Sequence, residues 1–420
     1  MRFEQSMHER DIPTVMRSVF RVAPYKLWKH RWNEWAEQEK SNPFFTDYFD
    51  TQFRIERSFE VTYDYYLTRH KVPQLDPLGY ELFSFLALLV GAYQRLSPKG
   101  QTRLAGSVRD GLQNTNGLVP VEVELRIAAH LMQSGFDVDF TDLEGRQRFD
   151  LLATKPGLEV EVDCKSVSGD VGRSIHARRF REFAGHLLPS VRKLAQKRDG
   201  FLVHITIPGN LQGDTQGLAA ESNAAISDAL GRAPPIETAQ AHGKVRISTF
   251  HLTSSPFGQQ TTVTEADLSA FLINSLGIRE NLNSVTHYVP GNGAVIILME
   301  SERPDRVVDG IYRQLKGSAG RQFSGKRPAV LCVRLRDISA SQLVSLANDK
   351  TNGLAMIATR LLHGGNRSHL AGISYISPSG TVTRSAANAL QDRGTAYYFP
   401  NPKNPSDAVA RLFAAEARMA

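Results

Sequence analysis

The stretch FDLLATKPGLEVEVDCK, residues 149–165, is the most informative part of this 420-residue chain. It predicts two strands joined by a tight turn at Pro156-Gly157, because proline and glycine are the residues that such turns favour. Side chains alternate between the two faces of a strand. The second strand therefore carries its charged residues on one face and its smaller apolar residues on the other: Glu159, Glu161, Asp163 and Lys165 against Val160, Val162 and Cys164.

The charged face has the composition of a phosphodiester-cutting site. Asp150 begins the first strand, next to the acids and the single lysine of the second. Carboxylate oxygens hold hard divalent cations such as Mg²⁺, and an ammonium group stabilises charge that develops on a phosphate. The simpler interpretation is an acidic strand with one face in water, so the neighbouring elements decide between the two.

The elements around this hairpin follow a recognisable order. Helical spacing of Leu125, Ala128 and Met132 predicts a helix that ends at Gly135, and residues 136–140 then predict a short strand. Downstream, residues 174–198 have a helical pattern and residues 201–207, FLVHITI, predict a buried strand. The expected order is helix, three strands, helix, strand.

This order and the spaced acids resemble the PD-(D/E)xK nucleases of the restriction-endonuclease-like fold. The resemblance covers residues 118–208 and implies an α/β fold with an αβββαβ core. It assigns the signature acid to Asp150 and the (D/E)xK motif to Asp163 and Lys165. Glu124 is the best match for the glutamate on the first helix, with Glu122 as the alternative, while Phe149 stands where the motif name has proline.

The resemblance implies a metal-dependent nuclease that acts on nucleic acid, with DNA expected. Asp150 and Asp163 would bind Mg²⁺ or Mn²⁺ with the backbone carbonyl of Cys164 as an extra ligand. Glu124 would complete the metal shell directly or through water. Lys165 would position or activate the attacking water, and Glu161 could replace or support Asp163. Restriction, phage defence, recombination and repair all stay open as settings.

Positive charge gathers downstream of the hairpin. The formal net charge is +7, and residues 171–200 contain eight basic residues against two acidic ones. Such charge favours a polyanionic partner, because lysine and arginine contacts with phosphates supply much of nucleic-acid affinity. The expected phosphate contacts here are Arg173, His176, Arg178 and Arg179. A helix face exposed to water explains most of these residues equally well.

A second basic run lies at residues 313–336, which contain no acid. Its glycine-rich segment, residues 317–328, predicts a loop that could cradle a nucleic-acid backbone through Arg321, Lys326 and Arg327. An ordinary helix-to-strand connection is the alternative. The segment GRQFSGKR comes close to a phosphate-binding loop, but it has arginine where a hydroxyl is needed and precedes a strand.

Three regions are expected along the chain. Residues 1–117 predict a mostly helical N-terminal region, in which an aromatic-rich segment, residues 44–66, is expected to supply core packing. Residues 118–208 form the nuclease-like core. Residues 209–420 predict an α/β C-terminal region that could extend the core sheet, with an expected helix at residues 303–318 and an expected strand at residues 329–335.

Several features favour a cytoplasmic protein without a membrane segment. Only two cysteines occur, Cys164 and Cys332, so neither a disulfide framework nor a cysteine zinc site is expected. The N-terminus lacks the apolar stretch of a signal peptide. The longest apolar run, residues 82–93, is too short to span a bilayer and predicts a buried helix. A homodimer or a protein partner stays open.

Two other functional classes fit the same sequence. One is a nucleic-acid-binding or assembly module on a nuclease-like fold that no longer cuts. The other is a small-molecule enzyme of the general α/β class, in which the acidic strand is purely structural. Metal-dependent cleavage would separate the nuclease from both alternatives. Salt-sensitive nucleic-acid affinity would separate the binding module from the small-molecule enzyme.

Overall fold

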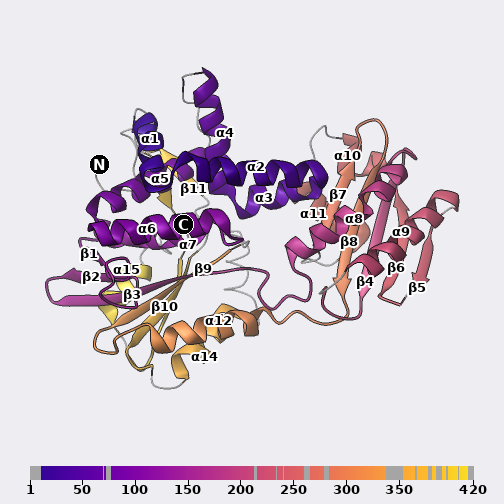
Figure 1. The fold of residues 1–420 in the computed structure, drawn as a ribbon. Coiled ribbons are helices and arrows are strands. Elements are labelled where there is room, and N and C mark those ends of the chain that lie inside the picture. Colours follow the sequence, from indigo (N-terminus) through magenta and orange to yellow (C-terminus); the bar gives the residue numbers. More distant parts are fainter. Residues whose placement is uncertain are drawn as a thin grey trace. The chain divides into compact units, whose positions relative to one another are not determined.

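In the computed structural model, helices and two separate mixed sheets form two α/β units (Figure 1). The described residues are 11–69, 71, 77–211, 215–232, 234–239, 241–259, 265–278, 283–336, 353–364, 367–376, 381–384, 390–393, 396–404 and 406–414. The first unit takes its described residues from Met1–Trp35, Phe49–Val171 and Val307–Ala420. The second takes them from Ala36–Tyr48 and Gly172–Arg306. The expected α/β class is therefore confirmed.

Helices form the N-terminal part of the described chain. They are α1 (Ile12–Val22), α2 (Tyr25–Ser41), the short η2 (Pro43–Phe45), α3 (Thr46–Gln52), α4 (Arg54–Arg69), α5 (Pro77–Arg95), α6 (Pro98–Gln113) and α7 (Val119–Gln133). Aromatic side chains fill the core among the first of them: Trp28 and Phe59 are fully buried and meet edge to face, with their ring centroids 4.8 Å apart. Most of the aromatic-rich segment is core, as expected, although Tyr65 is exposed.

A six-stranded mixed sheet forms the centre of the first unit. Its strands, in spatial order, are β1 (Asp137–Phe140), β2 (Leu151–Lys155), β3 (Leu158–Val167), β9 (Ala329–Leu335), β10 (Leu370–Ile376) and β13 (Ala396–Pro400). The pairs β1–β2 and β2–β3 are antiparallel, whereas β3–β9 and β9–β10 are parallel. The late strands of the chain thus continue the sheet that the acidic hairpin begins.

Helices cover both faces of this sheet (Figure 1). The helices α12 (Val307–Arg321) and α14 (Gly353–His363) pack an apolar cluster against the face that carries Val167, Leu331 and Val333. In Figure 1, α7 lies on the other side of the sheet from α12 and α14. The unit also contains α15 (Asp407–Ala414) and a small hairpin, β11 (Thr381–Arg384) with β12 (Leu390–Arg393).

The second unit has its own five-stranded sheet. The strand order is β5 (Ile236–Ala239), β6 (Lys244–Phe250), β4 (Gly200–Ile207), β8 (Ala294–Ser301) and β7 (Asn283–Tyr288). Within residues 172–306 its helical segments are α8 (Ala177–Ala195), α9 (Gln216–Gly231), η3 (Leu252–Ser254), α10 (Pro256–Gln259) and α11 (Glu265–Leu276), and η2 of the N-terminal part belongs to the same unit. One apolar cluster gathers residues of α8, α9 and the sheet, and another gathers residues of α10, α11 and the sheet. The unit is therefore a layered body with a core of its own.

The topology differs from the sequence expectation in the core expected at residues 118–208, and the region expected at residues 209–420 is divided between the two units. The helix and strand expected at residues 174–198 and 201–207 do form, as α8 and β4, but they belong to the second unit and its separate sheet. The strand that pairs with β3 is β9, and α12 precedes it. The segments α8–β4 and α12–β9 have the same local sequence pattern, a helix followed by a buried strand. Which strand pairs with β3 depends on long-range packing, and this local pattern does not encode it.

The long apolar run at residues 82–93 lies within α5, where its side chains are almost all buried. Among the described residues, no helix combines the length and the apolar character needed to cross a membrane.

Candidate active site

Asp150 stands at the point where β2 begins beside β3. Leu151 pairs with Val162 across the two strands, so Asp150 comes directly next to the Asp163–Cys164 segment. Its Oδ2 accepts a hydrogen bond of 2.6 Å from the backbone N–H of Cys164. Thr141, after the end of β1, holds the Asp150 backbone: its N–H donates to the Asp150 carbonyl at 2.9 Å. The backbone of Asp150 is thus held by the residue after β1, and its carboxyl group is held by β3.

Asp163 and Lys165 form an ion pair along β3. Lys165 Nζ lies 2.9 Å from Asp163 Oδ1 and 2.8 Å from Oδ2. It also donates to the carbonyl of Cys164 at 3.3 Å. The Asp163 side chain is fully buried, whereas that of Lys165 keeps 28% of its surface exposed. The pair therefore has a buried acid and an ammonium group that a ligand in solution can reach.

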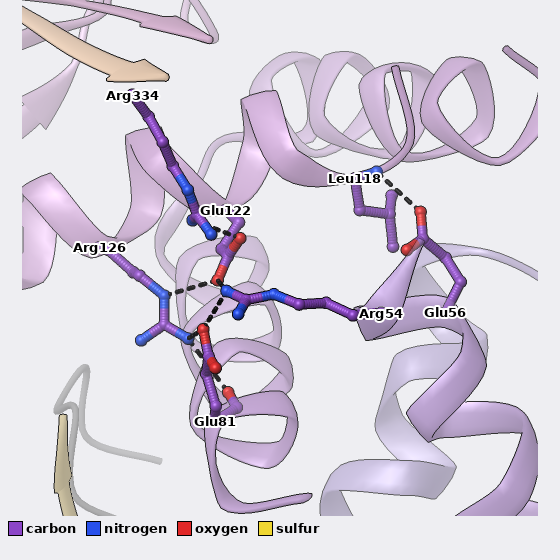
Figure 2. Close-up of polar contacts among 7 residues, drawn as sticks. All are labelled: Arg54, Glu56, Glu81, Leu118, Glu122, Arg126 and Arg334. Carbon is purple, nitrogen blue, oxygen red and sulfur yellow. Dashed lines mark hydrogen bonds and ion pairs between the residues drawn. The ribbon is translucent and has the colours of Figure 1, made fainter. Parts of the chain in front are cut away.

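Glu124, on α7, is the helical glutamate that lacks a partner for part of its carboxylate. Its Oε1 is buried and makes no hydrogen bond with the described residues. Glu122 differs, because it accepts from Arg334 on β9 at 2.6 Å and from Arg126 at 2.9 Å (Figure 2). The charge of Glu122 is thus neutralised by its surroundings, which leaves Glu124 as the glutamate free to take a further ligand.

The carboxyl groups of the site resist ionisation together. Burial, followed by the charge of Asp163, raises the pKa of Asp150 to about 7. Burial and the charge of Asp150 also raise the pKa of Glu124 well above its usual value. Burial raises the pKa of Asp163, against the opposing effect of Lys165.

The same acids affect the pKa of Lys165. Burial acts to lower its pKa, but Asp150 and Asp163 outweigh burial and raise it above its ordinary value. The ammonium group therefore stays charged at neutral pH. One lysine faces three acids, so full ionisation of the acids would give the site more negative charge than the lysine can balance.

This chemistry suits a hard divalent cation. The donors are carboxylate oxygens, and one of them, Glu124 Oε1, is buried with no hydrogen-bond partner in the described part of the chain. Within the part of the chain that the structure describes, no three His, Cys, Asp or Glu side chains stand close enough to hold a metal ion by themselves. A cation here would take one or two carboxylates and complete its shell with water, a carbonyl or substrate oxygens, as Mg²⁺ commonly does.

Glu161, expected as a substitute for Asp163, has other partners. Its carboxylate accepts from the N–H of Ser324 at 2.8 Å and also from the Ser324 hydroxyl. Arg327 lies 3.3 Å from the same carboxylate and also bonds Glu159. These contacts fasten the loop after α12 to β3, so both Glu161 and Arg327 have a structural role.

The other expected phosphate contacts divide between the two units. Arg173, His176, Arg178 and Arg179 belong to the second unit, whereas the carboxylates and Lys165 belong to the first. Arg178 and Arg179 both pair with Glu182, one helical turn away on α8. The sequence predicts that this basic helix and the acids share one core. Because α8 packs on the separate sheet of the second unit, a shared core no longer supports these phosphate contacts.

Arg321 and Lys326 lie in the first unit and are exposed. Arg321, at the end of α12, borders a hollow that also reaches Arg148 in the β1–β2 loop. Sequence reasoning missed Arg148, because only the folded chain brings this loop to α12. It also missed Asp142, an exposed acid after β1 whose charge raises the pKa of Asp150 and Glu124. Asp142 could have been found from the antiparallel pairing of β1 with β2, because this pairing brings the residues after β1 close to Asp150.

Comparison with protein-family models, with curated proteins and with solved structures finds no match to this chain. Function is therefore inferred from the geometry and the electrostatics of the site.

Proposed function

We propose that this protein is a metal-dependent nuclease that hydrolyses phosphodiester bonds, with DNA as the expected substrate. The observation that carries the proposal is the cluster of three buried or half-buried acids around one lysine. Asp150, Asp163 and Glu124 share one lysine, and the pKa values of all three acids are raised. A divalent cation would relieve their repulsion, and a phosphate group would find Lys165 partly exposed.

The topology of the first unit supports the same proposal. When residues 172–306 are left out, the order becomes α7, β1, β2, β3, α12, β9, with β9 parallel to β3. This is the helix, three strands, helix, strand order of a restriction-endonuclease-like core. On this interpretation residues 172–306, which make up most of the second unit, are an insertion between the third strand of that core and the helix that follows.

In the proposed reaction the acids bind the cation and the lysine binds the phosphate. Asp150 and Asp163 would hold the cation with the Cys164 carbonyl, and Glu124 would complete the shell directly or through water. When bound, the cation would lower the pKa of its water and stabilise the leaving oxygen. Lys165, charged because the acids raise its pKa, would bind a phosphate oxygen and offset the negative charge that develops there. Thr141 keeps Asp150 in place through the backbone.

A cleavage assay with a matched acid-to-amide pair tests this proposal. Wild type should cut DNA with Mg²⁺ or Mn²⁺ and stop when EDTA is added. The Asp163→Asn variant should lose this activity. Asp137→Asn, which removes an exposed acid at the far end of β1, should keep it. Equal loss in both variants, or activity that survives EDTA, would rule out the assigned site.

A second candidate is a nucleic-acid-binding module that does not cut. The observation that favours it is that, in the described residues, no three potential ligand side chains form a ready metal group. This candidate predicts nucleic-acid binding that weakens steeply with salt, unchanged by Asp163→Asn, with no cleavage in either metal. Binding and cleavage measured on the same preparations therefore separate the two functions.

A further inference from the structure

The first unit also has a hollow with a basic wall. It consists of two adjoining parts, of about 420 and 490 Å³, that share Arg148, Arg321 and Gln322. One wall is the β1–β2 loop and the other is the C-terminal end of α12 with the residues that follow it. None of the lining residues is an acid.

Two of the arginines in this hollow form no ion pair with the residues that the structure describes. Arg146 pairs with Asp139. Arg148 and Arg321 are exposed, and among the described residues neither has an ion pair or a side-chain hydrogen bond. Gln314, Gln322 and Ser318 add uncharged hydrogen-bonding groups around them. Exposed guanidinium groups with amides and a hydroxyl are the groups that recognise phosphate oxygens.

The hollow is linked directly to the candidate catalytic residues. Arg148 precedes Asp150 by two residues, which span at most about 7 Å of extended chain. On the other wall, Ser324 follows Arg321 and binds Glu161, two residues before Asp163 on β3. A strand with one phosphate at Asp150 and Lys165 could therefore place a neighbouring phosphate at these arginines.

We propose that this hollow binds the backbone phosphates of the nucleic-acid strand next to the bond that is cut, through Arg148 and Arg321. The inference rests on the proposed nuclease function and names the residues that hold its substrate. The alternative role of Arg321 is to offset the negative C-terminal end of α12. That role would affect the stability of the protein and leave its affinity for nucleic acid unchanged.

The test is fluorescence anisotropy with a labelled single strand and its duplex, in EDTA so that nothing is cut. The Arg148→Gln/Arg321→Gln variant should bind roughly tenfold or more weakly, and the slope of log affinity against log salt should fall by about 2. Its melting temperature should match wild type. The control, Arg109→Gln/Arg313→Gln, removes two exposed charges from α6 and α12 outside the hollow and should bind within about twofold of wild type.

The outcomes separate this inference from the function on which it rests. If the two double variants bind equally, the hollow has no special role and the inference is overturned, while the nuclease proposal stands. If wild type binds neither probe, both fail. Displacement of the strand by low-millimolar inorganic phosphate, at constant ionic strength, would assign the hollow to a small phosphate ligand and would also overturn the inference.

Discussion

At the scale of the residue, Asp150 is the carboxyl group whose surroundings most affect how the protein responds to pH. Its pKa rises from an ordinary value of 3.8 to about 7 in the folded chain. Between these values the folded protein holds a proton that the unfolded chain has lost. The stability that this group contributes is therefore fully present below about pH 4 and is lost as pH rises through about 7.

The Asp150→Asn variant should show how much stability the protein loses when Asp150 ionises. An amide keeps an oxygen for the Cys164 N–H but carries no charge. At pH 8 we expect the variant to be more stable than wild type by about 1–3 kcal/mol, and at pH 4 we expect little difference. Urea unfolding at the two pH values measures it. A gain of the same size at both pH values would show that charge repulsion at Asp150 is not the cause.

Divalent metal should relieve the same repulsion. Because a ligand that binds only the folded state raises its stability, Mn²⁺ should raise the melting temperature of wild type at pH 8 by several degrees. The increase should be smaller at pH 5, where raised pKa values keep Asp150 and Glu124 protonated. Asp163→Asn should abolish most of it and Asp137→Asn should not. An equal shift in both variants would point to metal binding elsewhere.

At the scale of the element, α7 is held to the sheet by a buried ionic network (Figure 2). Glu122 joins α7 to Arg334 of β9, and Arg126 lies 2.9 Å from the same carboxylate. Glu81 of α5 and Arg54 of α4 complete the group and bond each other. Glu122 is fully buried and Arg334 nearly so. The network fixes the helix that carries Glu124.

Glu122→Gln should therefore be strongly destabilising. The three arginines lower the pKa of Glu122 to about 2, against the effect of burial, so it is charged at neutral pH. Removing this charge leaves Arg334 buried with no carboxylate partner. We expect a loss of about 3–5 kcal/mol in the free energy of unfolding. Arg179→Gln, which breaks an exposed pair with Glu182, should cost less than about 1 kcal/mol. Similar losses would contradict the role of this network.

Local elements could be predicted from the sequence because their causes are local. The Pro156-Gly157 turn sets the register that brings Asp150 to Cys164, and the DxK spacing puts Lys165 on the same face as Asp163. The neighbour of β3 could not be predicted, because β9 lies more than 150 residues along the chain. Arg148 and Arg321 share a hollow for the same reason, through contacts between distant segments.

At the scale of the whole molecule, the two ends of the segment 172–306 lie next to each other. The N–H of Arg306 donates to the Gly172 carbonyl at 2.7 Å, so the two ends of this segment are neighbours. The segment has its own sheet and apolar clusters. Adjacent ends and a separate core are the properties that allow one domain to be inserted into another.

Excision of residues 173–305, with a short glycine-serine linker between Gly172 and Arg306, should leave the first unit folded. Phe44 should be changed to serine in the same variant, because its apolar neighbours belong to the removed segment. Circular dichroism should show a cooperative melt, and Mn²⁺ should still raise the melting temperature. Loss of the cooperative transition would mean that the first unit needs the second in order to fold.

The most direct test of the proposed function is cleavage of supercoiled plasmid and of single-stranded DNA with Mn²⁺, by wild type and by Lys165→Ala. Lys165 is partly exposed and its loss unpairs Asp163, so folding of the variant is checked by its melting curve. Wild type should cut at least one substrate, and Lys165→Ala should cut roughly 100-fold more slowly or not at all. Equal cutting by the two proteins would contradict the assignment of Asp150, Asp163 and Lys165 as the active site.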